Sequence, residues 1–200
     1  VLVNTEEIEV DYVLNSADYY HIEKILPNKF RSYPKIYWDK MKVCPSAILF
    51  SITLDIKLPK LEFHNLFFKG NLDEHTFFLY NTTILPPKPL FYVNITTKLF
   101  KEAPEGQENL FILIPSNPNR DIPVYEVNRV FKYVIEEISD FCKIDINNHI
   151  IEKRKFVNEK FLTKFNSFRC NAYGLSCDGY QNIFIRPKIK SLYLNNLYYC

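Results

Sequence analysis

The stretch SAILFSITL, residues 46–54, is apolar at nearly every position and is bounded by a proline before it and an aspartate after it. A short apolar run of this kind is typical of a buried strand. Its lack of alternation between apolar and polar residues predicts that both faces of the strand are covered. We therefore expect residues 46–54 to form a central strand with the rest of the fold arranged around it.

Further segments are predicted to be strands of the same unit. They are short, rich in β-branched and aromatic residues, and bounded by turn-forming residues, and they cover residues 61–68, 90–95, 110–115 and 150–157. We expect the first three of these segments to be neighbours of residues 46–54 in one mixed sheet.

The clearest helix is centred on Val134, because apolar residues between Val127 and Phe141 recur at spacings of three and four. One face of this helix is predicted to pack on the sheet. Strands and helices are interspersed along the chain, so we expect an α+β fold with a mixed, largely antiparallel sheet covered by helices. Outside this unit the pattern predicts a hairpin within residues 1–14, a short helix capped by Asp18 and a last strand at 195–199.

The composition disfavours several classes of protein. The 25 basic and 23 acidic residues leave a net charge of +2, which argues against a nucleic-acid binder. The four glycines form no nucleotide-binding loop, and the four histidines and five cysteines have no metal-ligand spacing. No apolar run has the length of a membrane-spanning helix, and no signal-peptide pattern opens the chain. We therefore expect a cytoplasmic protein without a metal site.

Several stretches resemble, in the same order, segments of the bacterial carotenoid (phytoene) desaturases, a family of flavoproteins. They are VDYVLNSADYYHIEKILPNKFRSYPKIYWDKMKVCPSAILF (10–50), LPKLEFHNLFF (58–68), PLFYVNITT (89–97), APEGQENLFILIP (103–115), FNSFRCNAYGLSCDGYQNIFIRPKIKS (165–191) and NNLYY (195–199). Collinear blocks of this length are far more specific than one short motif. One departure is Cys170, which stands where the family usually has glycine. That replacement is costly if the backbone there has a positive φ.

The resemblance implies that the chain is an interior and C-terminal fragment of a two-domain, Rossmann-like flavoprotein. Residues 1–18 would be a returning hairpin of the flavin adenine dinucleotide (FAD) binding domain, residues 19–165 the substrate-binding domain, and residues 166–200 the return segment to the FAD domain. The family's glycine-rich FAD motifs would lie outside these segments. This agrees with their absence from the chain, and with a chain that starts at Val1 and stops inside a predicted strand.

The resemblance also implies a reaction. Family members use FAD to remove hydrogen from a long-chain polyene such as phytoene, which extends its conjugation in carotenoid biosynthesis. The complete protein would then be an FAD-dependent oxidoreductase acting on CH–CH bonds, cytoplasmic and peripherally associated with a membrane surface. This chain would be inactive without the rest of the flavoprotein. Two alternatives stay open: a detached or decayed, non-catalytic domain that binds hydrophobic ligands, and a related carotenoid isomerase or retinoid saturase.

Candidate cofactor-binding residues follow from the resemblance. Asn15, Ser16, Ala17 and Asp18 are similar to the family segment that crosses beside the flavin. A strand end followed by Asp18 as a helix N-cap explains the same residues without a ligand.

Candidate substrate-binding residues are Tyr173, Gly174 and Gln181, in a segment that resembles the wall between substrate and flavin. A turn glycine and a surface amide are the alternative. Arg186, Lys188 and Lys190 would face a phosphate or anionic lipid, or form a solvated loop. The sequence assigns no catalytic acid or base.

A membrane-docking segment is predicted at residues 29–42, where Trp38 and other aromatic residues alternate with lysines. The alternative is an amphipathic helix that packs its aromatic side on the protein core.

Overall fold

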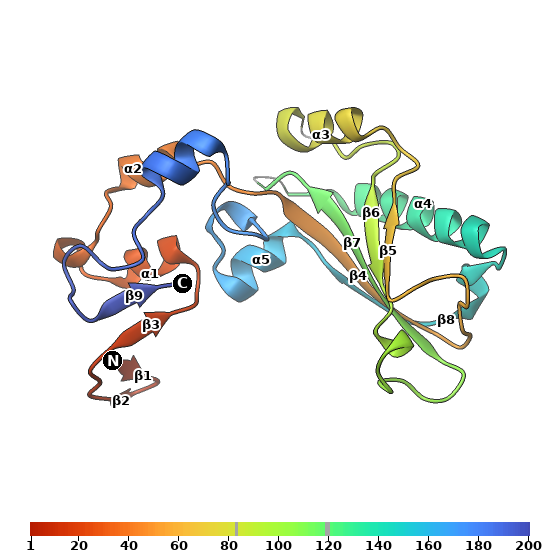
Figure 1. The fold of residues 1–200 in the computed structure, drawn as a ribbon, viewed down its shortest axis with the longest axis horizontal. Helices are drawn as coiled ribbons and strands as arrows, with labels where there is room; N and C mark the ends of the chain where they lie inside the picture. Colours follow the sequence, from red (N-terminus) through yellow and green to blue (C-terminus); the bar gives the residue numbers. More distant parts are fainter. Residues whose placement is uncertain (83, 119–120) are drawn as a thin grey trace.

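The computed structural model describes residues 1–82, 84–118 and 121–200. Figure 1 shows two lobes: a sheet lobe on the right, built within residues 46–165, and a terminal lobe on the left, built by residues 1–45 together with residues 166–200. Both ends of the chain lie in the terminal lobe. The chain therefore starts in the terminal lobe, builds the sheet lobe, and returns.

The sheet lobe contains a five-stranded antiparallel sheet in the order β5-β6-β7-β4-β8. Its strands are β4 (Ser46–Leu54), β5 (His64–Phe67), β6 (Phe91–Asn94), β7 (Glu108–Ser116) and β8 (Ile150–Phe156). The predicted strands, their neighbourhood in one sheet and the α+β class are confirmed. β4 pairs with β7 on one side and β8 on the other, so it is internal to the sheet as predicted.

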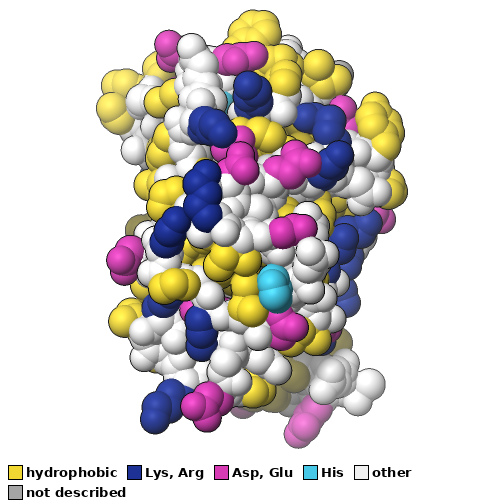
Figure 2. Space-filling view, turned by 90° about the vertical axis from the view of Figure 1, so that its right-hand side faces the viewer, with side chains coloured by type: hydrophobic (Ala, Val, Ile, Leu, Met, Phe, Trp, Pro, Cys, Tyr) yellow, Lys and Arg dark blue, Asp and Glu magenta, His cyan; other side chains and the backbone are white. Residues whose placement is uncertain are grey.

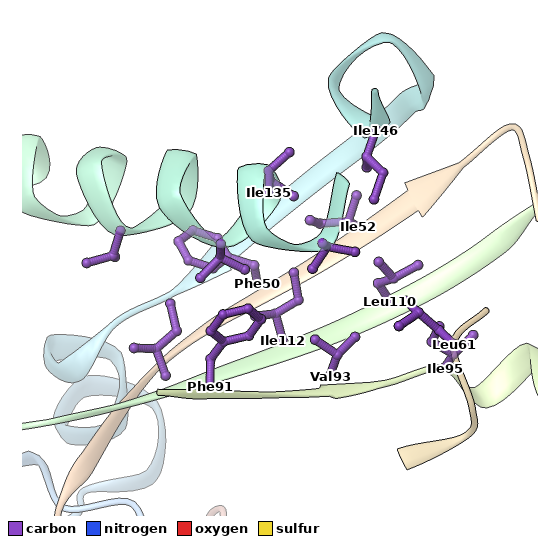
Figure 3. Packing of buried hydrophobic residues seen from close by; sticks show 14 of the residues in the cluster. Phe50, Ile52, Leu61, Phe91, Val93, Ile95, Leu110, Ile112, Ile135 and Ile146 are labelled. Atoms are coloured by element: carbon purple, nitrogen blue, oxygen red, sulfur yellow. The ribbon is translucent and has the colours of Figure 1, made fainter. Parts of the chain in front are cut away.

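One face of the sheet packs against α4 (Val124–Cys142), the helix predicted around Val134. Figure 3 shows side chains from the sheet and from α4 interleaved in this layer. The alternate residues Ile48, Phe50 and Ile52 of β4 are at most 2 % exposed, and Ile135 of α4 is fully buried. Burial of this amount of apolar surface is the main source of stability in the sheet lobe.

The opposite face of the sheet is more open than predicted. Leu49 and Thr53 of β4 are half-buried, Ser51 between them is exposed, and Phe111, which pairs with Ser51 from β7, is 37 % exposed. The prediction that both faces of residues 46–54 are covered is therefore wrong. The physical reason is that α4 covers one face only, while the short helix α5 (Asn158–Phe165) contacts only part of β4 on the other.

The terminal lobe is built from short elements: β1 (Leu2–Val3), β2 (Glu6–Glu7), β3 (Val13–Asn15), α1 (Tyr19–Ile25), α2 (Lys35–Lys40) and β9 (Leu197–Tyr199). β1 and β2 form a small hairpin, but β3 pairs in parallel with β9. The hairpin predicted within residues 1–14 is therefore shorter than expected. Its second strand was misplaced because β3 finds its partner at the other end of the chain, which no local pattern reveals.

The core of the terminal lobe is aromatic. Trp38 on α2 is 2 % exposed, and its ring lies 5.5 Å from that of Tyr19 and 5.9 Å from that of Phe168, between ring centroids. The carboxylate of Glu23, only 1 % exposed, accepts hydrogen bonds from the Tyr199 hydroxyl at 2.6 Å and from the Tyr33 backbone N–H at 3.0 Å. Stacked rings and one buried polar cluster thus replace the aliphatic packing of the sheet lobe.

The helix α3 (Leu72–Asn81) lies apart from the other helices, at the top of Figure 1. Among its residues only His75 is buried, and the Nδ1 atom of His75 accepts a hydrogen bond from the Leu90 backbone N–H at 3.1 Å. This bond holds α3 beside the segment that leads into β6.

The surface at the right-hand end of Figure 1 carries hydrophobic, basic and acidic side chains side by side, and neither sign of charge dominates it, as Figure 2 shows. Within the described ranges of the chain, no helix combines the length and the apolar composition needed to cross a bilayer.

Candidate functional site

A hollow in the terminal lobe, which we call the terminal cavity, has a volume of about 850 Å³. Its walls come from the end of β3 and the start of α1, from the chain after α5, and from the segment that precedes β9. Residues lining it include Ser16, Ala17, Asp18, Tyr19, Phe165, Asn171, Gly174, Arg186, Lys188 and Tyr199.

One wall of the terminal cavity is aromatic. The rings of Tyr19 and Tyr199 stack with centroids 3.7 Å apart and an angle of 11° between their planes. Burial is the main cause that raises the pKa of Tyr19 and Tyr199 far above the usual tyrosine value. Both hydroxyls are therefore protonated at physiological pH. Tyr199 is only 2 % exposed, so the accessible ring of this wall is that of the half-buried Tyr19, which Tyr199 backs by stacking.

Another part of the terminal cavity is cationic. Arg186 and Lys188 both line it, and Arg186 is oriented by a hydrogen bond from its Nη1 to the Asn182 side chain at 3.0 Å. Guanidinium and ammonium groups beside stacked rings suit a ligand that is both flat and anionic. Arg186 and Lys188 therefore add positive charge to the wall of the terminal cavity.

A second hollow, which we call the apolar groove, lies on the open face of the sheet and has a volume of about 680 Å³. Leu49 and Phe111 contribute to it from β4 and β7, Phe156 from β8, and Phe161 and Phe165 from α5. The Phe156 ring lies 4.9 Å from that of Phe161 and 5.8 Å from that of Phe165, between centroids. Ser51, Arg154, Lys155 and Lys160 also line the groove, so it is a largely apolar and aromatic surface with cationic side chains among its walls.

The apolar groove and the terminal cavity adjoin each other. Phe165, at the end of α5, lines both hollows, and its side chain is 59 % exposed. At the other side of Phe111 the sheet face becomes polar, with Asn109 and the ion pair of Glu152 with Arg154 at 2.7 Å. A long apolar ligand in the groove would therefore extend toward the terminal cavity rather than along the polar part of the face.

No protein-family model matches the chain. Individual proteins do. The carotenoid 3,4-desaturase of Haloarcula japonica is 28 % identical over 200 residues, an alignment that spans 98 % of this chain and 40 % of the relative. The zeta-carotene-forming phytoene desaturase of Myxococcus xanthus is 28 % identical over 204 residues, which span 97 % of this chain and 38 % of the relative. The chain is a homologue of the carotenoid and phytoene desaturases. It spans about two fifths of the length of these relatives.

The similarity to desaturases extends to fungi. The phytoene desaturase of Cercospora nicotianae is 33 % identical over 119 residues, 57 % of this chain and 18 % of the relative. The family resemblance inferred from the collinear blocks is thus confirmed, and the short coverage of the relatives is consistent with a fragment of a desaturase.

In this desaturase homologue, three of the four predicted cofactor residues line the terminal cavity, and their polar groups are largely engaged in structure. The Asp18 carboxylate accepts hydrogen bonds from the backbone N–H groups of His21, at 3.1 Å, and Phe168, at 3.0 Å. Asn15 is buried, and its side chain bonds both the N–H and the C=O of Ala17. Asp18 and Asn15 therefore shape this wall, and Ser16 and Ala17 provide its surface.

The three predicted substrate residues do not form one surface. Gly174 lines the terminal cavity, with a φ of 83° that favours glycine. Gln181 is 3 % exposed, and its side-chain amide bonds the N–H and C=O of Lys42 and the C=O of Ser176. Tyr173 is 56 % exposed and is not part of the cavity lining. Gln181 therefore positions the chain, which is neither the ligand contact nor the surface amide considered from the sequence.

The aromatic segment at residues 29–42 does not present Trp38 to a membrane. Trp38 is 2 % exposed and lies among Tyr19, Tyr20 and Phe168. The packing alternative describes this tryptophan correctly, because burying its large ring stabilises a lobe in which few aliphatic side chains are buried.

The sequence did not reveal the apolar groove. Its residues come from three strands and a helix. The first and the last of them, Leu49 and Phe165, are more than one hundred positions apart in the sequence. Two signals were available: the polar residues Ser51 and Thr53 on one side of the apolar run, and the mixed charged and apolar composition of β8. Both indicate a strand face that is not fully buried. Among the described residues, no group of His, Cys, Asp and Glu has the geometry of a metal site.

Proposed function

We propose that the protein to which this chain belongs is an FAD-dependent carotenoid desaturase, with the apolar groove as the surface that holds the polyene. The observation that carries the proposal is the aromatic groove on the open sheet face of a desaturase homologue. A long conjugated hydrocarbon needs a continuous apolar wall from which water is excluded, because an unordered or hydrated chain would not present one bond to the cofactor.

The terminal cavity fits part of a flavin nucleotide. Tyr19, backed by the buried Tyr199, offers flat surface, and Arg186 and Lys188 offer cations to an anionic group. The chain contains no glycine-rich loop to hold a pyrophosphate, so this part of the cofactor would be held by other segments of the complete protein. When bound, FAD supplies the acceptor for the hydrogen removed from the polyene. Residues of this chain would orient the two ligands and exclude water.

This assignment suggests a division of the chain into domains. Residues 1–18 and 166–200 would belong to the FAD domain, and residues 19–165 to the substrate domain. The parallel pairing of β3 with β9 supports grouping the two ends. Residues 19–45 are also part of the terminal lobe. For example, the Tyr19 hydroxyl donates to the Lys188 carbonyl at 3.0 Å. We therefore draw the boundary after residue 45.

The test is to express the complete reading frame that encodes this chain in a bacterial host that accumulates phytoene, and to record the absorption of extracted carotenoids. We expect absorption to shift to longer wavelength as conjugation lengthens. Phe165→Ala should lower product formation about fivefold, the effect of losing about 1 kcal/mol of aromatic contact. Phe141→Ala, an exposed phenylalanine on α4 outside the groove, is the matched control and should leave product formation unchanged.

Unchanged phytoene in cells that contain folded, flavin-loaded protein would contradict the proposal and favour the non-catalytic alternative. A change in the cis or trans geometry of the polyene without added double bonds would favour an isomerase.

A further inference from the structure

Two antiparallel segments lie side by side where the chain leaves the terminal lobe for β4. We call them the connector: residues 42–45, which lead into β4, and residues 172–176. Backbone hydrogen bonds join them from Ala172 N–H to Pro45 C=O at 3.0 Å, from Cys44 N–H to Gly174 C=O at 2.9 Å, and from Ser176 N–H to Lys42 C=O at 3.0 Å. This short ladder therefore ties two segments of the terminal lobe together at the point where the chain enters β4.

Two cysteines face each other at the connector. The Cys44 thiol donates to the Leu175 carbonyl at 3.5 Å, two residues before Cys177, and Cys177 is near enough to raise the pKa of the Cys44 thiol by electrostatic repulsion. Cys44 is half-buried and Cys177 is exposed. Sulfur atoms from residues 133 positions apart in the sequence are thus brought together by the fold.

The surroundings of the two sulfurs differ. The Nη1 atom of Arg186 donates to the Cys177 sulfur at 3.8 Å, and Cys177 is open to solvent. Burial is the main cause that raises the pKa of the Cys44 thiol, and the adjacent Cys177 adds to it. An accessible sulfur beside a cation, with a second thiol held next to it, is the arrangement in which one cysteine reacts with an oxidant and the other resolves the product.

We propose that Cys44 and Cys177 form a reversible disulfide when the protein meets hydrogen peroxide. The Cys177 sulfur attacks the peroxide O–O bond and becomes a sulfenic acid, releasing one water. The Cys44 sulfur then displaces the sulfenic oxygen as a second water, which forms the S–S bond. In total two thiols and one peroxide give one disulfide and two waters, and an added dithiol reverses the change. This modification is independent of the proposed desaturase activity.

The disulfide would add a covalent link to a ladder that now depends on hydrogen bonds. It would fix the loop that carries Gly174, a lining residue of the terminal cavity, against the start of β4. We therefore expect oxidation to make the connector more resistant to local opening, with slower amide exchange of Cys44 and Ser176, whose N–H groups form the ladder.

Peptide mapping of the complete protein tests the proposal. After brief treatment with hydrogen peroxide and alkylation of free thiols, trypsin should release residues 43–57 linked to residues 170–188, since Lys42, Lys57, Arg169 and Lys188 are the cleavage sites and Pro187 protects Arg186. The second peptide also contains Cys170. Cys170→Ser is therefore the matched variant that must keep the link, whereas Cys177→Ser must lose it.

Further outcomes decide the matter. In Cys44→Ser we expect a sulfenic acid at Cys177 that a dimedone probe labels, because the resolving thiol is missing. The link should also fail to form when the protein is oxidised in denaturant. A link that persists in Cys177→Ser, a link through Cys170, or no link in folded protein whose exposed thiols are oxidised would each overturn the proposal.

Discussion

The two lobes are stabilised in different ways. In the sheet lobe, aliphatic residues of β4 and α4 pack in a dry layer, and each strand lies beside a strand of the same contiguous region. In the terminal lobe, short elements from the two ends of the chain meet, as in the Tyr199 to Glu23 hydrogen bond between residues 176 positions apart. The comparison teaches that the sheet lobe depends on buried apolar area, while the terminal lobe depends on a few long-range stacking and polar contacts.

The largest expected effect is in the sheet core. Phe50→Ala removes a ring that is 2 % exposed and packs 4.9 Å from that of Phe131, between centroids. We expect a loss of about 3 to 5 kcal/mol in the free energy of unfolding, from lost burial and the cavity left behind. Urea titration followed by far-UV circular dichroism measures it. Ile151→Ala, at a residue 53 % exposed on β8, should cost less than about 0.5 kcal/mol.

A smaller effect is expected from the polar cluster of the terminal lobe. Tyr199→Phe keeps the stacked ring but removes the hydroxyl that donates to the buried Glu23 carboxylate. Leaving a buried carboxylate short of a donor should cost about 1 to 3 kcal/mol. Trp38 is the chain's single tryptophan and lies in this lobe, so its fluorescence reports local unfolding there in a preparation of this chain. If fluorescence and circular dichroism shift by the same amount, the lobes unfold as one unit and the contrast between them is weaker than we infer.

Backbone strain gives a stabilising change in the same lobe. Cys170 has a φ of 56°, in the left-handed region that residues other than glycine adopt at a cost. The sequence comparison with desaturases indicated that glycine is usual here, and the structure supplies the positive φ that makes it favourable. We expect Cys170→Gly to raise the free energy of unfolding by about 0.5 to 1 kcal/mol. Cys142→Gly on α4, where no positive φ occurs, should instead destabilise the protein.

The smallest effect concerns α3 and pH. Burial lowers the pKa of His75 from its ordinary value of 6.5, and its Nδ1 accepts the Leu90 N–H only when that nitrogen carries no proton. Because the unfolded chain binds the proton more readily, stability should fall as pH drops below about 6.5 and continue to fall toward the lower folded pKa. Amide exchange of Leu90 should therefore accelerate in mild acid. His75→Gln, which can still accept the bond, should remove this dependence, and an unchanged pH profile in that variant would contradict the role of His75.

The accuracy of the sequence predictions follows the same division between lobes. The predictions of β4, α4 and the neighbouring strands were correct because the spacing of apolar residues and the composition of a short segment indicate which of its residues are buried. The N-cap role of Asp18 was found for the same reason, since its His21 partner is three residues away. The extent of the first hairpin and the membrane-facing role for Trp38 were wrong because the partners of β3 and Trp38 lie at distant positions. That Arg186 and Lys188 line the terminal cavity is shown only by the fold, and their contact with a phosphate or an anionic lipid stays a prediction.

By itself the sequence determined the α+β class, the central strand, the covering helix and the homology to desaturases, because hydrophobic periodicity and collinear similarity are carried by the order of residues. Only the tertiary structure decided that one sheet face stays open, that Phe165 joins the groove to the terminal cavity, and that Cys44 lies beside Cys177. These features depend on which distant segments come together, and that outcome is set by the packing of the whole chain rather than by any local pattern.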